Sequence, residues 1–91
     1  MFYVYILQSS LNNYFYVGHT NNLKRRLREH QAGRTTSLKG RGPYKLAYYE
    51  QFETRKEALV REKYFKSGSG REKRPALVTN FPQEFVRQFK A

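Results

Sequence analysis

The sequence contains no cysteine, no aspartate and no tryptophan. Without cysteine there is no disulfide framework, no thiolate nucleophile and no zinc site built on cysteine. Without aspartate there is no Ser-His-Asp triad and no aspartate-built calcium loop, although a glutamate can replace the aspartate of a triad. All seven acidic residues are glutamates, so any carboxylate chemistry depends on this small set.

Positive charge dominates the composition. Eighteen Lys and Arg residues outnumber the acidic ones and give a formal net charge of +11. This excess favours a polyanionic partner, first nucleic acid and second an anionic membrane, and a soluble basic protein is the plainer alternative. With 38% hydrophobic residues, the 91 residues predict one small domain, 1–91. The apolar start, Met1 to Leu7, has neither signal-peptide nor membrane-span features, so we expect a cytoplasmic protein.

Three segments are typical of β-strands. Residues 2–7 and 14–18 are β-branched and aromatic, and the turn at 11–13 between them contains two asparagines, which predicts an antiparallel hairpin. Residues 44–52 predict a third strand. Alternation places four hydrocarbon side chains of the hairpin on a face suited to the core and leaves the tyrosines on the other face with reachable hydroxyls. The expected core set is Val4, Ile6, Phe15 and Val17.

Two helices follow from capping signals and periodicity. Thr20 or Asn21 can cap a helix that ends near His30, and the capping box 54–57 opens a second helix that ends near Lys66. Residues 31–43 predict a basic loop.

The C-terminal part predicts shorter helices. Residues 67–70 read Ser-Gly-Ser-Gly and predict a break, and 71–78 predict a short basic helix weakened by Pro75. A last helix begins near Pro82 and carries a phenylalanine stripe that favours packing. The predicted fold is α+β, a small and mostly antiparallel three-stranded sheet flanked by helices, in the order β-β-α-β-α plus C-terminal helices.

Glu62 occupies an unexpected position. It shares a helix face with Ala58 and Phe65, where a buried side chain is expected. One interpretation is a structural ion pair with a nearby Lys or Arg. The other is a ligand for Mg²⁺, because this cation keeps several waters and needs only one or two carboxylates.

Arg26 is the second charged residue on an inward face, between Leu23 and Leu27. Its guanidinium suits bidentate contact with phosphate, and the alternative is a side chain that covers apolar surface. His30, one turn later, is a candidate proton carrier or phosphate donor, although a lone histidine is more often structural.

The remaining Lys and Arg residues of three segments form a candidate nucleic-acid-binding surface. They lie in the first helix, in the following basic loop and in the segment after residue 70. The expected phosphate contacts are Lys24, Arg25, Arg28, Arg34, Lys39, Arg41, Arg71, Lys73 and Arg74.

The ordered set of motifs resembles the GIY-YIG nuclease superfamily. The tripeptides 3–5 and 16–18 read Tyr-Val-Tyr and Tyr-Val-Gly, Arg26 follows Gly18 by eight residues, and Glu62 lies in the later helix. The resemblance runs from about residue 2 to 70 and is closest to small single-domain bacterial members. The first tripeptide departs from the family name by having Tyr3 in place of glycine.

The resemblance implies metal-dependent hydrolysis of phosphodiester bonds. It implies that Tyr5 and Tyr16 position or deprotonate the attacking water and that Arg26 stabilises the transition state. It also implies that Glu62 holds one Mg²⁺ or Mn²⁺.

Some family members carry a further polar residue after the first helix, for which His30 and Thr35 are candidates. Some carry a late asparagine, for which Asn80 is the candidate. Larger members add a targeting module.

We therefore expect an endonuclease acting on DNA, or on RNA, with low sequence specificity or structure selectivity. A protein partner or a homodimer is a possible source of targeting. The alternative is a non-catalytic nucleic-acid-binding module on the same fold, and a membrane-surface protein is disfavoured because no strongly amphipathic basic helix is present.

Overall fold

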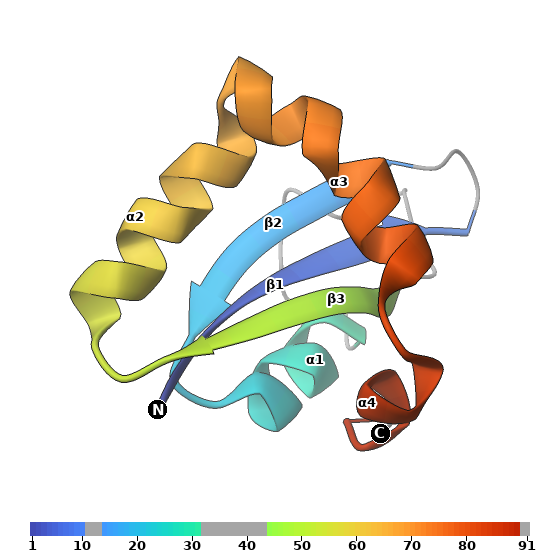
Figure 1. Cartoon of the computed structure of the whole chain (residues 1–91). Coiled ribbons are helices and arrows are strands. Elements are labelled where there is room, and N and C mark those ends of the chain that lie inside the picture. The colour runs from blue at the N-terminus through green and yellow to red at the C-terminus, as the bar shows by residue number, and fades with distance from the viewer. Residues whose placement is uncertain (11–13, 32–43, 90–91) are drawn as a thin grey trace.

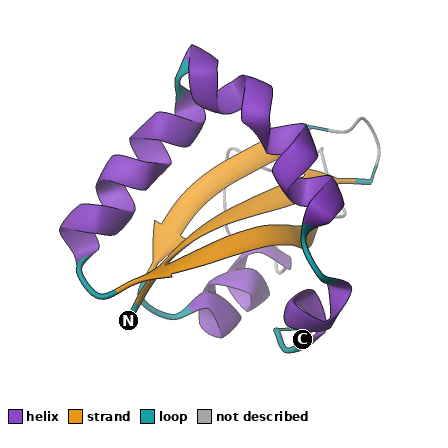
Figure 2. Cartoon of the chain, in the orientation of Figure 1, coloured by secondary structure: helices purple, strands orange, loops and turns teal. Residues whose placement is uncertain are grey.

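The computed structural model of the protein describes residues 1–10, 14–31 and 44–89. Three strands, β1 (Phe2–Ser9), β2 (Phe15–Thr20) and β3 (Tyr44–Phe52), form one antiparallel sheet in the order β2-β1-β3. The helices are α1 (Leu23–Gln31), α2 (Arg55–Lys66), α3 (Gly68–Asn80) and α4 (Gln83–Arg87). The predicted α+β class and the order β-β-α-β-α plus C-terminal helices are therefore confirmed (Figures 1 and 2).

Helices cover both faces of the sheet. In Figure 1, α2 and α3 lie on one side of the strands, and α1 and α4 lie on the other. The central strand β1 supplies both cores: Val4 and Ile6 pack with Ala58 and Phe65 of α2. The opposite core lies under α1 and contains a sequence-distant set of residues: Tyr5, Leu7, Leu23, Leu27 and Leu46.

The expectation of a single hydrocarbon core with an open tyrosine face is therefore wrong. Tyr5 is 1% exposed and is one of the largest fully buried side chains. The physical reason is that α1 buries its own leucines on the tyrosine face, so that face is a second core rather than a free surface. The set of Val4, Ile6 and Val17 is buried as expected, and Phe15 packs at its margin.

The hairpin register sets the relative position of the two motif strands. Tyr5 pairs with Gly18, and Leu7 pairs with Tyr16. On the other side of β1, the pairing with β3 shifts between Ile6 and Leu7, so Tyr48 and Leu46 are successive partners. This bulge lets Leu46 face α1 while Tyr48 faces α2, although both positions are even-numbered.

Most helix signals are confirmed, and two need correction. The capping box is present: Thr54 accepts from the Glu57 amide, and Glu57 accepts from the Thr54 amide. At α1 the cap is Asn22, whose side-chain oxygen accepts from the Arg25 amide at 3.0 Å, rather than Thr20 or Asn21. The Thr20 hydroxyl instead accepts from the Asn22 amide.

The predicted break at 67–70 is confined to one residue. Ser67 ends α2 and caps α3, accepting from the Gly70 amide. The helix α3 then continues past Pro75 to Asn80, which is longer than expected. Pro75 lies on the exposed side of α3, where water can satisfy the carbonyl that proline leaves without a donor.

Gly70 is required by close packing at the corner between α2 and α3. A Cβ there would lie 1.9 Å from the Tyr64 carbonyl oxygen, whereas a Cβ at Gly68 would meet nothing within 4 Å.

We expect Gly70→Ala to lower the free energy of unfolding by about 2 kcal/mol or more, because rigid backbone must move. Gly68→Ala is the matched control and should raise it by about 0.5–1 kcal/mol through helix propensity. Urea unfolding measures both, and equal effects would contradict the packing account.

Candidate active site

Four predicted site residues meet on the α1 side of the sheet. Tyr5 comes from β1, Tyr16 from β2, and Arg26 and His30 from successive turns of α1. The Tyr5 hydroxyl lies 2.8 Å from His30 Nε2. The Tyr16 ring stands edge-on to His30, with ring centroids 5.4 Å apart. The hairpin register and the i, i+4 spacing in α1 thus bring together residues that the sequence separates.

Gly18 makes room for this cluster. A Cβ at this position would lie 2.6 Å from the Tyr5 hydroxyl oxygen and 3.2 Å from Tyr16 Cε1. Because Gly18 pairs directly with Tyr5, any side chain there would displace the hydroxyl. The glycine of the second tripeptide therefore has a steric role in the site.

Arg26 lies at the rim of this cluster, half-buried, with about a third of its side chain exposed. Its Nη1 donates to Glu29 Oε1 at 3.0 Å. The pKa of Arg26 is raised, first by donation to the Tyr5 hydroxyl and then by donation to Glu29. The guanidinium thus reaches the cluster with a permanent positive charge and keeps an exposed edge for a ligand.

Burial keeps both Tyr5 and His30 uncharged. Burial is the main cause that raises the pKa of Tyr5, and Arg26 only partly offsets it. Burial and the nearby Arg26 lower the pKa of His30 to about 4. At neutral pH a neutral Tyr5 hydroxyl therefore shares a hydrogen bond with a neutral His30, and in the tautomer with its proton on Nδ1 the hydroxyl is the donor.

Glu62 reaches the sheet from α2, on the opposite layer. Its Oε1 lies 2.5 Å from His19 Nδ1, and its Oε2 accepts from Lys66 Nζ at 2.7 Å. Burial alone would raise the pKa of Glu62, but the donors Lys66 and His19 outweigh it and lower the pKa. The structural ion pair foreseen as one interpretation is therefore present, and its partner is Lys66.

Glu62 is also coupled to the tyrosine cluster around the edge strand. Its charge contributes to the raised pKa of Tyr5, so the carboxylate acts on the hydroxyl across the edge of the sheet. The strand β2 lies at the edge of the sheet. Alternation along it places Gly18 on the α1 face, opposite Tyr5, and His19 on the α2 face, so the two layers come close together at this edge.

A family model described as the GIY-YIG catalytic domain matches residues 1–74. The chain belongs to the GIY-YIG family. Among similar proteins, the UPF0213 protein of Limosilactobacillus reuteri is 42% identical over 80 residues, which cover 85% of this chain and 82% of the relative. The UPF0213 protein of Haloquadratum walsbyi is 43% identical over 77 residues, 84% of each chain.

A solved structure supports the same fold. The solution NMR structure of a UPF0213 protein from Bacillus halodurans has a TM-score of 0.54 and 32% identity, and it covers 88% of this chain and 86% of its own. The relatives' names state no activity. The GIY-YIG domain indicates the nuclease superfamily, whose members generally depend on a divalent metal and act on nucleic acid.

The side chains around Glu62 fit a divalent metal ion that is held by a single protein carboxylate. Within residues 1–10, 14–31 and 44–89, no group of three or more His, Cys, Asp or Glu side chains could hold a metal by itself. A cation bound to Glu62 would need water and substrate phosphate as its other ligands, as Mg²⁺ commonly does. Lys66, which now neutralises Oε2, is about half-exposed and can move aside.

His19 and Lys66 were not singled out from the sequence. Lys66 follows Glu62 by four residues, a spacing that predicts an ion pair on a helix. His19 shares the parity of Phe15 and Val17, so alternation along β2 places it on the α2 face. Its contact with Glu62 spans 43 residues, for which the sequence carries no local signal.

The expected phosphate-binding cations divide into three groups. Lys24, Arg25 and Arg28 are exposed on α1, and Arg71 and Lys73 are exposed on α3. Arg74 is half-buried, and its Nε donates to the Phe65 carbonyl at 2.8 Å, so part of its donor capacity serves the fold. Arg34, Lys39 and Arg41, together with the site candidate Thr35, lie outside the described residues.

Asn80, the other late candidate, is exposed at the C-terminal end of α3. That helix packs against α2 and β3, whereas the tyrosine cluster lies under α1.

No helix in the described part of the chain is long and apolar enough to cross a membrane.

The buried His30 predicts a specific pH dependence of stability. Its folded pKa of about 4 lies below the reference value of 6.5. The contribution of neutral His30 to the free energy of unfolding is therefore complete above pH 6.5 and is lost as the pH falls toward 4. Between pH 7 and 4.5 the wild type should lose about 2 kcal/mol more unfolding free energy than His30→Gln, which keeps an acceptor for Tyr5 without titrating.

Urea unfolding at the two pH values measures this difference, and NMR titration of the His30 ring measures the pKa directly. Equal losses in the wild type and the variant, with a His30 pKa near 6.5, would contradict the buried neutral imidazole.

Proposed function

We propose that this protein is a divalent-metal-dependent endonuclease that hydrolyses phosphodiester bonds in DNA, with low sequence specificity or structure selectivity. The observation that supports this most directly is the convergence of Tyr5, Arg26 and His30 beside Gly18: the Tyr5 hydroxyl lies 2.8 Å from His30 Nε2, and Arg26 is close enough to influence the pKa of both residues. Such an arrangement combines a proton path with a permanent positive charge at a partly exposed rim, which suits attack on a phosphodiester.

Tyr5 and His30 form the proton path. Tyr5 is almost fully buried, so the attacking water must reach its oxygen at the partly exposed Arg26 rim; there it can pass a proton to that oxygen while the Tyr5 hydroxyl proton moves to His30 Nε2, 2.8 Å away. The low pKa of His30 keeps the imidazole neutral at neutral pH, and Nε2 can accept this proton in the tautomer that carries its own proton on Nδ1. Tyr16, packed edge-on to His30, orients the imidazole and presents a second phenol to the substrate.

Arg26 supplies charge stabilisation. Its guanidinium contacts Tyr5 and Glu29 and remains about a third exposed, so one edge can face a phosphate. The negative charge that develops on the phosphoryl oxygens is then stabilised by a group that holds its proton throughout.

Glu62 is the proposed metal ligand. When bound, Mg²⁺ or Mn²⁺ would supply Lewis-acid stabilisation of the phosphate and of the leaving oxygen. His19 fixes Oε1 of the carboxylate, and Lys66 neutralises Oε2 until a cation or substrate displaces it.

A non-catalytic nucleic-acid-binding module is the second candidate. It is favoured by one observation, the complete engagement of both Glu62 oxygens by His19 and Lys66. In that case the ion pair is structural, and Arg26 and the exposed cations of α1 bind phosphate without turnover. A protein partner or homodimer that directs either activity stays a prediction.

Nicking of supercoiled plasmid with Mg²⁺, Mn²⁺ or chelator tests the proposal. Arg26→Ala and Glu62→Gln should each reduce the nicking rate by about 10²-fold or more, because each removes charge stabilisation at the phosphate. Arg26→Lys should also be impaired, since it keeps the charge but loses the planar fork.

The matched controls are Lys56→Ala and Glu53→Gln, exposed residues of the same charge types outside the cluster. They should nick within about two-fold of the wild type, given that surface charges act weakly. Nicking that persists in chelator, or in Glu62→Gln, would overturn the metal-dependent mechanism. DNA retention with a steep salt dependence and no cleavage would favour the binding module.

A further inference from the structure

A second surface feature lies next to the candidate active site, along the outer edge of β2. It is an open groove of about 510 Å³ between this strand and the corner where α2 meets α3. Its lining combines aromatic and basic side chains: Tyr14, Phe15, Tyr16, Lys66, Arg71 and Arg74. No carboxylate is among the described residues that line it, so the groove is suited to an anion.

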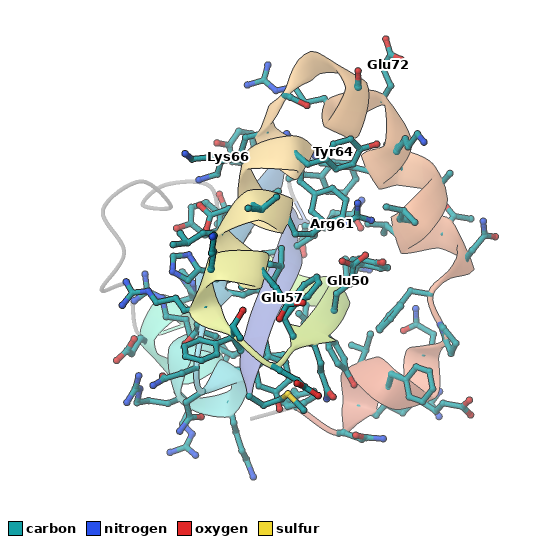
Figure 3. The ribbon with its side chains drawn as sticks, turned by 60° about the vertical axis from the view of Figure 1, so that its left-hand side comes forward. Glu50, Glu57, Arg61, Tyr64, Lys66 and Glu72 are labelled. Carbon is teal, nitrogen blue, oxygen red and sulfur yellow. The ribbon has the colours of Figure 1, made fainter. Side chains whose placement is uncertain are left out.

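The groove is continuous with the proposed catalytic residues. Tyr16 belongs to the tyrosine cluster, and Lys66 pairs with Glu62. In Figure 3, Lys66 lies on one flank of α2, whereas Arg61 and Tyr64 lie on the other with Glu50. Both cations are paired, Arg61 through two hydrogen bonds to Glu50 and Lys66 with Glu62, so the additional positive charge of the groove comes from Arg71 and Arg74 of α3.

The cations of the groove are close enough to repel one another. The pKa of Arg74 is lowered, first by burial and then by the charge of Arg71, and Tyr14 partly offsets this. A bound phosphate would relieve this repulsion, because it places negative charge between like charges.

Tyr14 adds a flat apolar surface beside these cations. The residue is 39% exposed, and its carbonyl accepts a hydrogen bond from the Ser9 amide at 2.8 Å. An aromatic ring next to Lys and Arg is the combination that binds single strands, where a base stacks and its phosphates contact the cations. In a duplex both faces of each base are already covered by neighbouring bases, so this stacking is unavailable.

We infer that the groove along β2 binds an unpaired nucleotide strand, with one base stacked on Tyr14 and its phosphates on the groove's cations. The inference rests on the proposed function and narrows its substrate to nucleic acid with an unpaired segment beside the scissile bond. Tyr16 and Lys66 then connect the bound strand to Arg26 and Glu62.

Fluorescence anisotropy in chelator tests binding without cleavage. The probes are a labelled 12-nucleotide oligothymidylate, its oligouridylate counterpart and a 12-base-pair hairpin duplex. Tyr14→Ala should weaken binding of the single strands by about ten-fold or more and change duplex binding less than two-fold. Tyr14→Trp should retain the single-strand affinity, because it keeps a stacking surface. A preference between the DNA and RNA strands identifies which nucleic acid the groove takes.

Charge is tested by the salt dependence of single-strand binding. Arg71→Gln should reduce the slope of log K against log salt by about 0.7, the value for one phosphate contact on a single strand. Lys56→Gln removes the same charge on the other flank of α2 and should leave the slope unchanged. Circular dichroism confirms that each variant is folded.

Equal weakening of single-strand and duplex binding by Tyr14→Ala, or no weakening of either, would overturn the inference. So would a Tyr14→Trp variant as weak as Tyr14→Ala. These binding measurements need no turnover. An absence of nicking in the plasmid assay would therefore reject the nuclease proposal, and the binding of single strands in the groove could still be interpreted.

Discussion

The burial of the Tyr5 hydroxyl is the constraint on which the rest of the site depends. Tyr5 lies on the central strand, under α1, and is almost fully inaccessible. A buried phenol needs hydrogen-bond partners, because an unsatisfied hydroxyl costs on the order of 1–3 kcal/mol. His30 provides one at 2.8 Å, the charge of Arg26 acts on the hydroxyl from the rim, and Gly18 leaves the space. The contacts that make Tyr5 a stable core residue are therefore the contacts proposed for catalysis.

This arrangement has an electrostatic consequence. Tyr5 and His30 are both kept neutral by burial, so Arg26 is the permanent charge of the cluster, balanced by Glu29 at its rim. Glu62 carries the opposite charge on the other layer and is balanced by Lys66. The two charges lie on the two sides of the edge strand β2, where the proposed function places the substrate. A phosphate at that edge would meet a guanidinium directly and a carboxylate only through a cation.

Local patterns predicted most of the fold. The capping box, the third strand Tyr44–Phe52 and the order of strands and helices all follow from short-range signals. The length of α3 did not, because tertiary packing of Gly70 against Tyr64 and the solvated side of Pro75 override local helix-breaking tendencies. The second core was not predicted for a related reason. Alternating tyrosines are also typical of a solvent-exposed face of a strand, and only tertiary packing of the α1 leucines shows that this face is buried.

Within the site, the sequence pointed to the charged residues that are on unexpected helix faces but could not supply their partners. Arg26 and Glu62 were conspicuous because inward charges are costly. Their contacts depend on the hairpin register and on the β2 edge, and His19 approaches Glu62 from 43 residues away. Alternation along β2 limits such partners to Phe15, Val17 and His19, of which only the histidine is polar, so the face was predictable although the contact was not.

The location of the site at β2 follows from how the two sheet edges are covered. The β3 side is closed by aromatic packing: Phe81 stands edge-on to Tyr48 and Tyr49, and Phe89 packs on Tyr3 and Tyr49. The β2 side instead carries Tyr14, Tyr16 and Gly18 in succession, next to a basic groove. A polymer cannot thread into a closed cavity and must approach laterally. An open edge strand lined by aromatic rings and cations would give it that approach, and the buried Tyr5 behind the strand holds His30, the other residue of the proposed proton path, in place.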